Sequence, residues 1–172
     1  MAILAAHLND SAICVTDEGR ILYREPGFAL LEDDHPKTGN EAYSNARLKP
    51  RRIQNRFWSE LATAPLSDPR FQHMSTADLV SRQLEDIWRK VAQPGDRLAI
   101  AVPGYMDTDK LGLLLGVAME LDIGVVAMVD AAVAATRRHY LHAVPVHIDL
   151  GLHVATLTRL MQEGQVQVER SA

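Results

Sequence analysis

The sequence contains one cysteine, few aromatic residues and no long apolar run. The single cysteine, Cys14, excludes a disulfide within the chain and is typical of a reducing compartment. The longest apolar segment, residues 111–119, is far shorter than the ~20 residues that a membrane-spanning helix needs. The apolar amino terminus lacks the basic leader of a secretory signal. We therefore predict a cytoplasmic protein without membrane insertion.

A surplus of positive charge is also absent. The formal net charge is -4 and the isoelectric point is near 5.9, and the one dense basic cluster, Lys49–Arg52, is short. Nucleic acids and anionic membranes are bound mainly through basic surfaces, so the composition argues against both. The arginines in this region are expected to form a solvated face, with an anion grip as the alternative. They are Arg51, Arg52 and Arg56.

Two other kinds of site lack support. No Ser/His/Asp or Cys/His arrangement is visible, and Cys14 has no positive neighbour that would activate its thiol. His139 and His142 have the spacing of adjacent helical turns, but no second pair completes a zinc site. Nucleophilic catalysis and structural zinc are therefore disfavoured.

What is present is a chain of 172 residues, 47% of them hydrophobic, which is enough for one good core. Alternating apolar residues predict strands over residues 3–8, 12–16 and 20–24, with a hairpin turn at Asp17-Glu18-Gly19. Proline, glycine and acidic residues then predict a surface connection over residues 25–49, ending in a short helix from Asn40 to Leu48.

Helices and strands alternate through the middle of the chain. The helix that Ser75 and Asp78 begin ends before Pro94, and Asp107 is expected to cap the helix over 110–121. Gly112 and Gly116 would lie on one face of that helix and allow close packing on the sheet. The other predicted elements are strands 96–102 and 124–129 and a helix from Asp130 to about Tyr140.

The stretch from Val146 to Leu160 predicts a strand, a tight turn and a second strand, and residues 165–169 predict a last strand. Asp149 at the strand end and Gly151 after it bring a carboxylate and an unencumbered backbone amide to one spot, which suits a metal-bound phosphate. The polar turn over residues 9–11 occupies the same local position after the first strand. An ordinary polar hairpin turn is the alternative.

A three-strand unit therefore begins twice. The first copy, with its helix–strand alternation, predicts an α/β domain over residues 1–144, with a mixed five-stranded sheet and helices on its faces. Residues 145–172 would be the opening strands of a second, truncated lobe. Because such strands would expose apolar surface, we expect more chain or a partner to cover them.

Four segments, in this order, resemble the actin, heat-shock chaperone and sugar-kinase superfamily of ATP-binding proteins, and they cover nearly the whole chain. Residues 39–50 resemble the chaperone motif G-x-x-A-x-x-x-A-x-x-x-P, and Val102-Pro103-Gly104-Tyr105 resembles V-P-A-Y. Residues 130–135 resemble E-P-T-A-A-A, and 149–151 resemble the start of D-L-G-G-G-T. Glu25-Pro26 is similar to bacterial actins. The resemblance implies a ribonuclease H-like fold of the actin-like ATPase lobe type.

The resemblance also implies a site for ATP and Mg²⁺. Asp149 would hold the metal, Asp130 would position the attacking water, and both would be the catalytic carboxylates. The phosphates would meet four residues of the two turns, Gly151, Asn9, Ser11 and His7. Each acid also has a structural interpretation, since Asp130 suits a helix N-cap and Asp149 a turn. His7 is also an ordinary strand-end histidine.

The departures from the family pattern predict a degenerate site. His7 and Asn9 stand where the first phosphate turn, D-x-G, has its Asp and Gly, and Leu152 and His153 replace glycines of the second. No lysine occupies the position of the chaperones' catalytic one, and the adenosine-binding part belongs to a second lobe. We expect ATP and Mg²⁺ binding to be weak or lost and the chain to act as an assembly or interaction scaffold.

Two alternatives remain. In the first, the protein is an active Mg-ATPase of the same superfamily, and the missing lobe completes the site, so this chain alone would be inactive. In the second, it is a ribonuclease-like nuclease, which would need Asp10, Asp130 and Asp149 to converge on two metals. A scaffold implies a protein partner or self-association, and unpaired final strands make a strand-swapped or edge-paired dimer reasonable.

Overall fold

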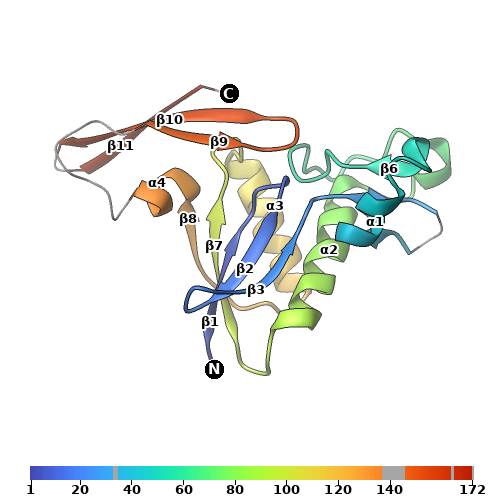
Figure 1. The fold of residues 1–172 in the computed structure, drawn as a ribbon, viewed down its shortest axis with the longest axis horizontal. Coiled ribbons are helices and arrows are strands. Elements are labelled where there is room, and N and C mark those ends of the chain that lie inside the picture. Colours follow the sequence, from blue (N-terminus) through green and yellow to red (C-terminus); the bar gives the residue numbers. More distant parts are fainter. Residues whose placement is uncertain (33–34, 137–145, 164, 172) are drawn as a thin grey trace.

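The computed structural model describes residues 1–32, 35–136, 146–163 and 165–171. Its centre is a five-stranded sheet of order β3-β2-β1-β7-β8 (Figure 1). The first three strands are antiparallel, while β7 and β8 run parallel to β1. The mixed five-stranded sheet is thus confirmed. Its strands are β1 (Ile3–His7), β2 (Ile13–Asp17), β3 (Arg20–Glu25), β7 (Arg97–Val102) and β8 (Val125–Asp130).

The first hairpin follows from its turn residues. Glu18 and Gly19 join β2 to β3 with φ values of 47° and 88°, the positive pair that matches the right-handed twist of two-residue hairpins. Cys14 lies in β2 but is only half-buried.

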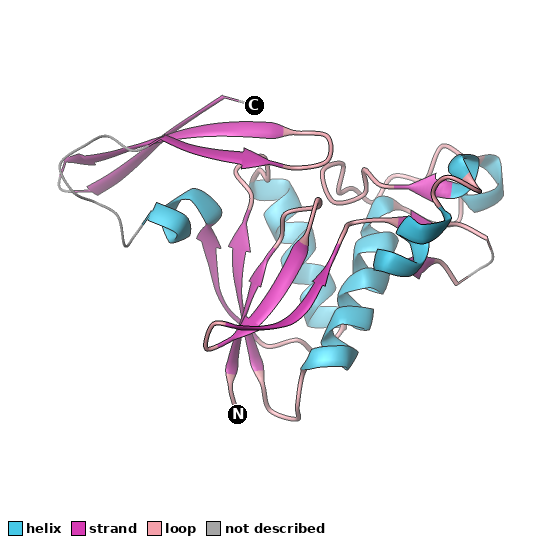
Figure 2. Ribbon diagram, in the orientation of Figure 1, coloured by secondary structure: helices cyan, strands magenta, loops and turns pink. Residues whose placement is uncertain are grey.

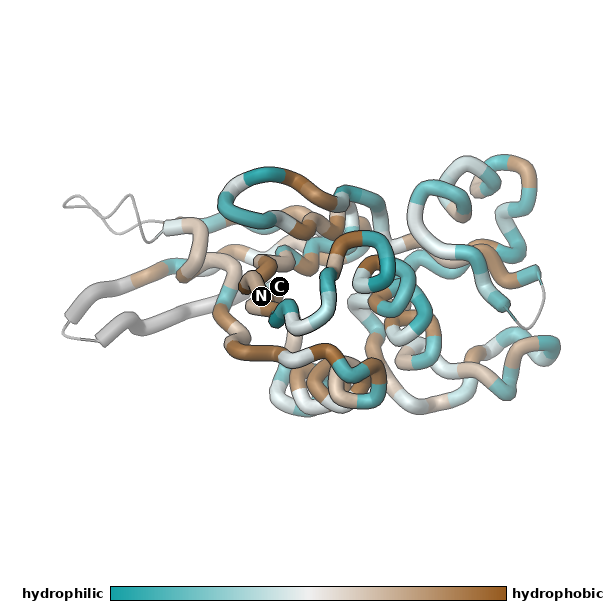
Figure 3. The backbone as a smooth tube through the Cα atoms, turned by 90° about the horizontal axis from the view of Figure 1, so that it is seen from below, coloured by the Kyte–Doolittle hydropathy of each residue, from teal (hydrophilic) through white to brown (hydrophobic). Residues whose placement is uncertain are grey.

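Two long helices cover one face of this sheet (Figure 2). Helix α2 (Thr76–Val91) and helix α3 (Thr108–Glu120) enclose the main core together with the inward side chains of the strands. Figure 3 shows brown, hydrophobic stretches in the central part of the molecule. On the opposite face Ile3 and Ile21 remain 60% and 57% exposed. The core therefore lies between the sheet and the two helices.

Both predicted helix starts are confirmed. In a reciprocal capping box, Asp78 N–H donates to Ser75 Oγ (3.2 Å) and Ser75 N–H donates to Asp78 Oδ2 (2.7 Å). Asp107 Oδ1 accepts from Lys110 N–H at 2.9 Å and caps α3. Each cap satisfies amides that have no partner inside the helix.

The predicted packing of Gly112 and Gly116 on the sheet is wrong. Both glycines face solvent, and a Cβ built on either meets nothing within 4 Å. The buried face of α3 is formed by Leu114, Val117 and Ala118 instead. The larger apolar side chains face the core because their burial removes more apolar surface from water.

The prediction of an irregular surface connection after β3 is also wrong. This part of the chain contributes to a small sheet of order β5-β4-β6. A separate cluster of Phe28, Leu30 and Ala42 is buried beneath it, and Tyr43 packs edge-on against Phe28 at 5.1 Å. The elements of this region are β4 (Ala29–Leu30), β5 (Lys37–Thr38), α1 (Gly39–Asn45), the 3-10 helix η1 (Pro50–Arg52), β6 (Ile53–Gln54) and the 3-10 helix η2 (Pro69–Phe71).

The carboxyl-terminal part forms a third, antiparallel sheet of order β11-β10-β9. It contains β9 (Val146–Leu150), β10 (Ala155–Glu163) and β11 (Gln165–Ser171), and helix α4 (Ala131–Thr136) contacts β9 and β10. The predicted helix beyond Thr136, the 144/145 boundary, His139 and His142 lie outside the described residues. Within the described part, no helix is long and apolar enough to cross a membrane.

Replacing Ser75 by alanine tests the capping box. The substitution removes the acceptor for the Asp78 amide, so we expect the free energy of unfolding to fall by about 1 kcal/mol. Urea denaturation of the intact chain measures it. Ser67→Ala is the matched control, because Ser67 is exposed and makes no side-chain hydrogen bond with a described residue. An equal loss in both variants would contradict a role for the cap.

Candidate functional site

The two polar turns singled out in the sequence meet in space. The turn after β1 lies against the turn that joins β9 to β10, and this hairpin crosses the end of the central sheet (Figure 1). The paired residues are about 140 positions apart in the chain, at separations of 140 and 142. The long-range fold therefore places both turns at one site.

Asn9 is the bridge between the turns. Its Nδ2 donates to Asp149 Oδ1 at 2.6 Å and to the Leu150 carbonyl at 3.1 Å. Its Oδ1 accepts from the backbone N–H and the hydroxyl of Ser11, at 2.9 and 2.5 Å. The amide side chain is 9% exposed and has partners at both ends. Three of the predicted site residues, Asn9, Ser11 and Asp149, are thus brought together by direct hydrogen bonds.

Asp10 makes the second link. Its residue is 1% exposed, its Oδ1 accepts from the Leu152 N–H at 2.7 Å, and its carbonyl accepts from the Gly27 N–H at 2.7 Å. Burial raises the pKa of this carboxyl, and the charge of Asp149 adds to the rise, while the Leu152 hydrogen bond and His153 oppose it. A buried carboxylate therefore holds the second turn by a backbone amide.

A glycine is required at position 151 because the turn packs closely against Asp10. A Cβ at this position would lie 2.6 Å from Asp10 Oδ1 and 3.1 Å from the Val154 carbonyl. The Gly151 N–H donates to that same carbonyl at 2.9 Å. With the Leu152 N–H on Asp10, two successive amides of the turn already donate inside the protein.

Tyr105 lies close enough to this site for the charges of Asp10 and Asp149 to act on its phenol. Its hydroxyl is buried and has no hydrogen-bond partner among the described residues. Burial raises the pKa of the phenol, and the charges of Asp10 and Asp149 raise it further. The sequence pattern had placed Tyr105 in the V-P-G-Y segment without a role. Its proximity to two carboxylates is a tertiary feature.

Two other predicted site residues have mainly structural surroundings. Asp130 Oδ1 accepts from the Ala132 N–H at 2.9 Å and the Val133 N–H at 3.3 Å, so its carboxylate caps α4 as the structural interpretation expects. His7 ends β1 opposite Cys14 and lines a cavity of about 330 Å³ together with Asn9 and Ser11. The catalytic role of Asp130 and the phosphate role of His7 stay predictions.

No metal cluster accompanies Asp149 in the described ranges: nowhere in them do three or more His, Cys, Asp or Glu side chains gather in a way that could hold an ion. Of the arginines singled out in the sequence, Arg52 pairs with Glu32 at 3.6 Å and Arg56 with Glu60 at 3.3 Å. The metal role of Asp149 stays a prediction.

Solved structures with the same arrangement are actin-like proteins. The chain superposes on MreB5 of Spiroplasma citri bound to ADP with a TM-score of 0.71, over 98% of this chain and 51% of that one. The chain thus has the fold of an actin-like lobe. MreB5 of the same organism bound to AMPPNP gives a TM-score of 0.65, over 91% of this chain and 48% of that one. Identity is 15% in both cases.

This lobe therefore spans about half the length of the solved proteins that it resembles. The sequence matches no protein-family model and no curated protein. The α/β fold of the actin-like lobe type that the four short motifs predict is confirmed by this likeness.

Asp10→Asn tests the buried charge. The asparagine keeps an acceptor for the Leu152 N–H but carries no charge. Because burial raises the folded-state pKa of Asp10 above its ordinary 3.8, the folded state binds this proton more tightly than the unfolded state. The wild type therefore loses stability as pH rises through that folded pKa. As the pH rises through that pKa, we therefore expect the free energy of unfolding of Asp10→Asn to increase relative to that of the wild type. Urea denaturation at a series of pH values measures this difference.

Asp10→Ala is the matched variant. It leaves the Leu152 N–H without an acceptor and should be less stable by about 1–3 kcal/mol at every pH. If Asp10→Asn lost as much stability as Asp10→Ala, the carboxylate's charge would be stabilising and our account of its burial would be wrong.

Proposed function

We propose that this protein is an assembly or interaction scaffold built on an actin-like lobe, in which a contact between its own two turns has replaced nucleotide binding. The observation that carries the proposal is the pair of links made by Asn9 and Asp10 across the site. We place the scaffold in the cytoplasm, in keeping with the single cysteine.

Phosphates in such a fold would lie between the two turns and take hydrogen bonds from backbone amides. Here the amides of Gly151 and Leu152 are already used, one on Val154 and one on Asp10. The Asn9 side chain spans the gap from β1 to Asp149. Asp10 also adds a carboxylate next to Asp149, which repels a further anion. The residues present therefore do not fit a triphosphate.

An active Mg-ATP site is the second candidate. The observation in its favour is that both similar MreB5 structures are described as nucleotide complexes, with AMPPNP and with ADP. Asp149 and Gly151 stand at the positions that would then serve the metal and the phosphate. This function requires the second lobe and a rearrangement that frees the turn from Asp10.

Calorimetric titration with ATP and Mg²⁺ separates the two when it is made on a version of the protein that carries a second lobe, because the ATPase candidate requires that lobe. We expect no binding up to millimolar ATP even then, because the turns hold each other. Micromolar binding that Asp149→Ala abolishes and Glu120→Ala preserves would overturn the scaffold proposal. Glu120 is the control because it is an exposed carboxylate at the far end of α3.

Self-association is the form of assembly that the last sheet supports. Val146, Ile148 and Leu150 alternate along β9 and are 56%, 59% and 64% exposed, and Leu157 of β10, opposite Ile148, is 48% exposed. Together they form one uncovered apolar sheet face. Strand β9 is also an edge of its sheet, so both a face and an edge are open to a second copy.

Light scattering of the chain across the micromolar range tests this. We expect a mass above that of a monomer, and Ile148→Asp should lower it because a charge is placed on the apolar face. Ile21→Asp alters an equally exposed isoleucine of the central sheet and should leave the mass unchanged. A strictly monomeric wild type would contradict self-association.

A further inference from the structure

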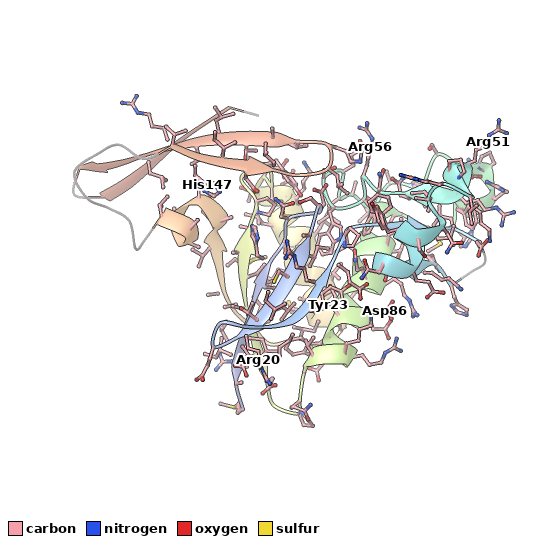
Figure 4. The ribbon with its side chains drawn as sticks, in the orientation of Figure 1. Arg20, Tyr23, Arg51, Arg56, Asp86 and His147 are labelled. Atoms are coloured by element: carbon pink, nitrogen blue, oxygen red, sulfur yellow. The ribbon has the colours of Figure 1, made fainter. Side chains whose placement is uncertain are left out.

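The segment after α1 lies at the end of the molecule farthest from β10 and β11 (Figure 1), and it is rich in basic residues. It includes η1. We call it the basic tip and define it as Arg47, Leu48, Lys49, Arg51 and Arg52. Arg51 points outward from this end (Figure 4). The tip is thus separated from the Asn9–Asp149 site and can be occupied without disturbing it.

The positive charge of the tip is only partly balanced. Glu32 pairs with Lys49 and, at 3.6 Å, with Arg52, and its ion pair with Lys49 holds the pKa of Glu32 below its usual value. Arg47 and Arg51 make no hydrogen bond or ion pair with any described residue. Among the described residues, the tip therefore carries two exposed guanidinium groups without a partner, and the one carboxylate paired within it, Glu32, already serves two cations.

The backbone of the tip is held by internal hydrogen bonds. The amides of Leu48 and Lys49 both donate to the Asn45 carbonyl, at 3.0 and 2.9 Å. The Arg52 amide donates to the Lys49 carbonyl at 2.9 Å, and the Arg52 carbonyl accepts from the amide of Leu31, the residue after β4, at 2.8 Å. Pro50 between them further limits the chain. Little backbone entropy remains to be lost when a partner binds.

The shape of the tip favours a protein partner over a flat surface. A cavity of about 580 Å³ is lined by Glu32 and by residues 48–52. Leu48, 78% exposed, is the large apolar side chain of this lining. A protruding side chain can enter such a concavity, whereas a lipid surface presents nothing that protrudes. Arginine forks also match carboxylates with paired hydrogen bonds.

We propose that the basic tip binds an acidic segment of another protein, in which carboxylates flank an apolar side chain. The carboxylates pair with Arg47 and Arg51, and the apolar side chain covers Leu48. This goes beyond the scaffold role by stating the chemistry of a partner. Binding at the tip does not depend on the state of the nucleotide site. The ATP titration therefore tests the scaffold proposal alone, and the experiment below tests the tip alone.

Fluorescence anisotropy with the full chain tests the proposal. The probe is a short labelled peptide of glutamates with one central leucine, compared with the same peptide carrying glycine at the centre. We expect the leucine peptide to bind more tightly. Arg51→Glu should weaken it about tenfold at low salt, since the charge that meets the carboxylates is reversed. Leu48→Ser should remove the advantage of leucine over glycine.

Arg56→Glu is the matched control, because Arg56 is also exposed but pairs with Glu60 and does not line the cavity. It should change the affinity less than about twofold. Circular dichroism checks that each variant is folded. Equal weakening by Arg51→Glu and Arg56→Glu would show a general charge effect and overturn the proposal. Tighter binding to vesicles of anionic phospholipid, or to a single-stranded oligonucleotide, would overturn it as well.

Discussion

The position of the Asp10 carboxylate is the constraint on which the rest of the site depends. This group is shut away from water and still accepts a hydrogen bond from a residue 142 positions away. Removing a carboxylate from water is unfavourable unless its oxygens are satisfied. The β9–β10 turn supplies that amide, so the hairpin has one favourable position on the lobe. The raised pKa of Asp10 reflects the part of this cost that the hydrogen bond leaves uncompensated.

A chain of close contacts leads from Asp10 into the core. The Gly27 amide donates to the Asp10 carbonyl, and a Cβ on Gly27 would lie 2.7 Å from the Trp58 ring. Trp58 Nε1 in turn donates to Gln83 of α2 at 2.7 Å, and Gln83 Nε2 donates to the Pro26 carbonyl at 3.0 Å. Each polar atom in this buried path has a partner, which is what makes such a network rigid. The two turns are therefore fastened to the main core.

Local patterns in the sequence predicted most of the fold, because caps, turns and periodicity act within a few residues. Ser75 with Asp78 and Glu18 with Gly19 are examples. The small sheet was missed because strands of two residues, such as Ala29–Leu30, leave no periodic signal. The orientation of α3 was predicted wrongly. Its glycines and its larger apolar residues compete for the face that meets the sheet, and the larger residues take it because they bury more apolar surface. Of the predicted site residues, Asn9, Ser11, Asp149 and Gly151 lie together, and their roles stay predictions. The role of Asp10 depends on a tertiary contact, which no local pattern contains.

The parallel pairing of β1 with β7 has a consequence for synthesis. Ile3 lies opposite Arg97, so the edge of β1 that pairs with β7 has no native partner until ninety or more further residues have been made. At translation rates of roughly 5–20 residues per second, this edge stays open for about 5–20 s in the nascent chain. During that interval β1 exposes unpaired backbone groups and apolar side chains such as Leu4. Until β7 exists, β1 is therefore the strand of the central sheet whose free edge is open to non-native pairing for longest.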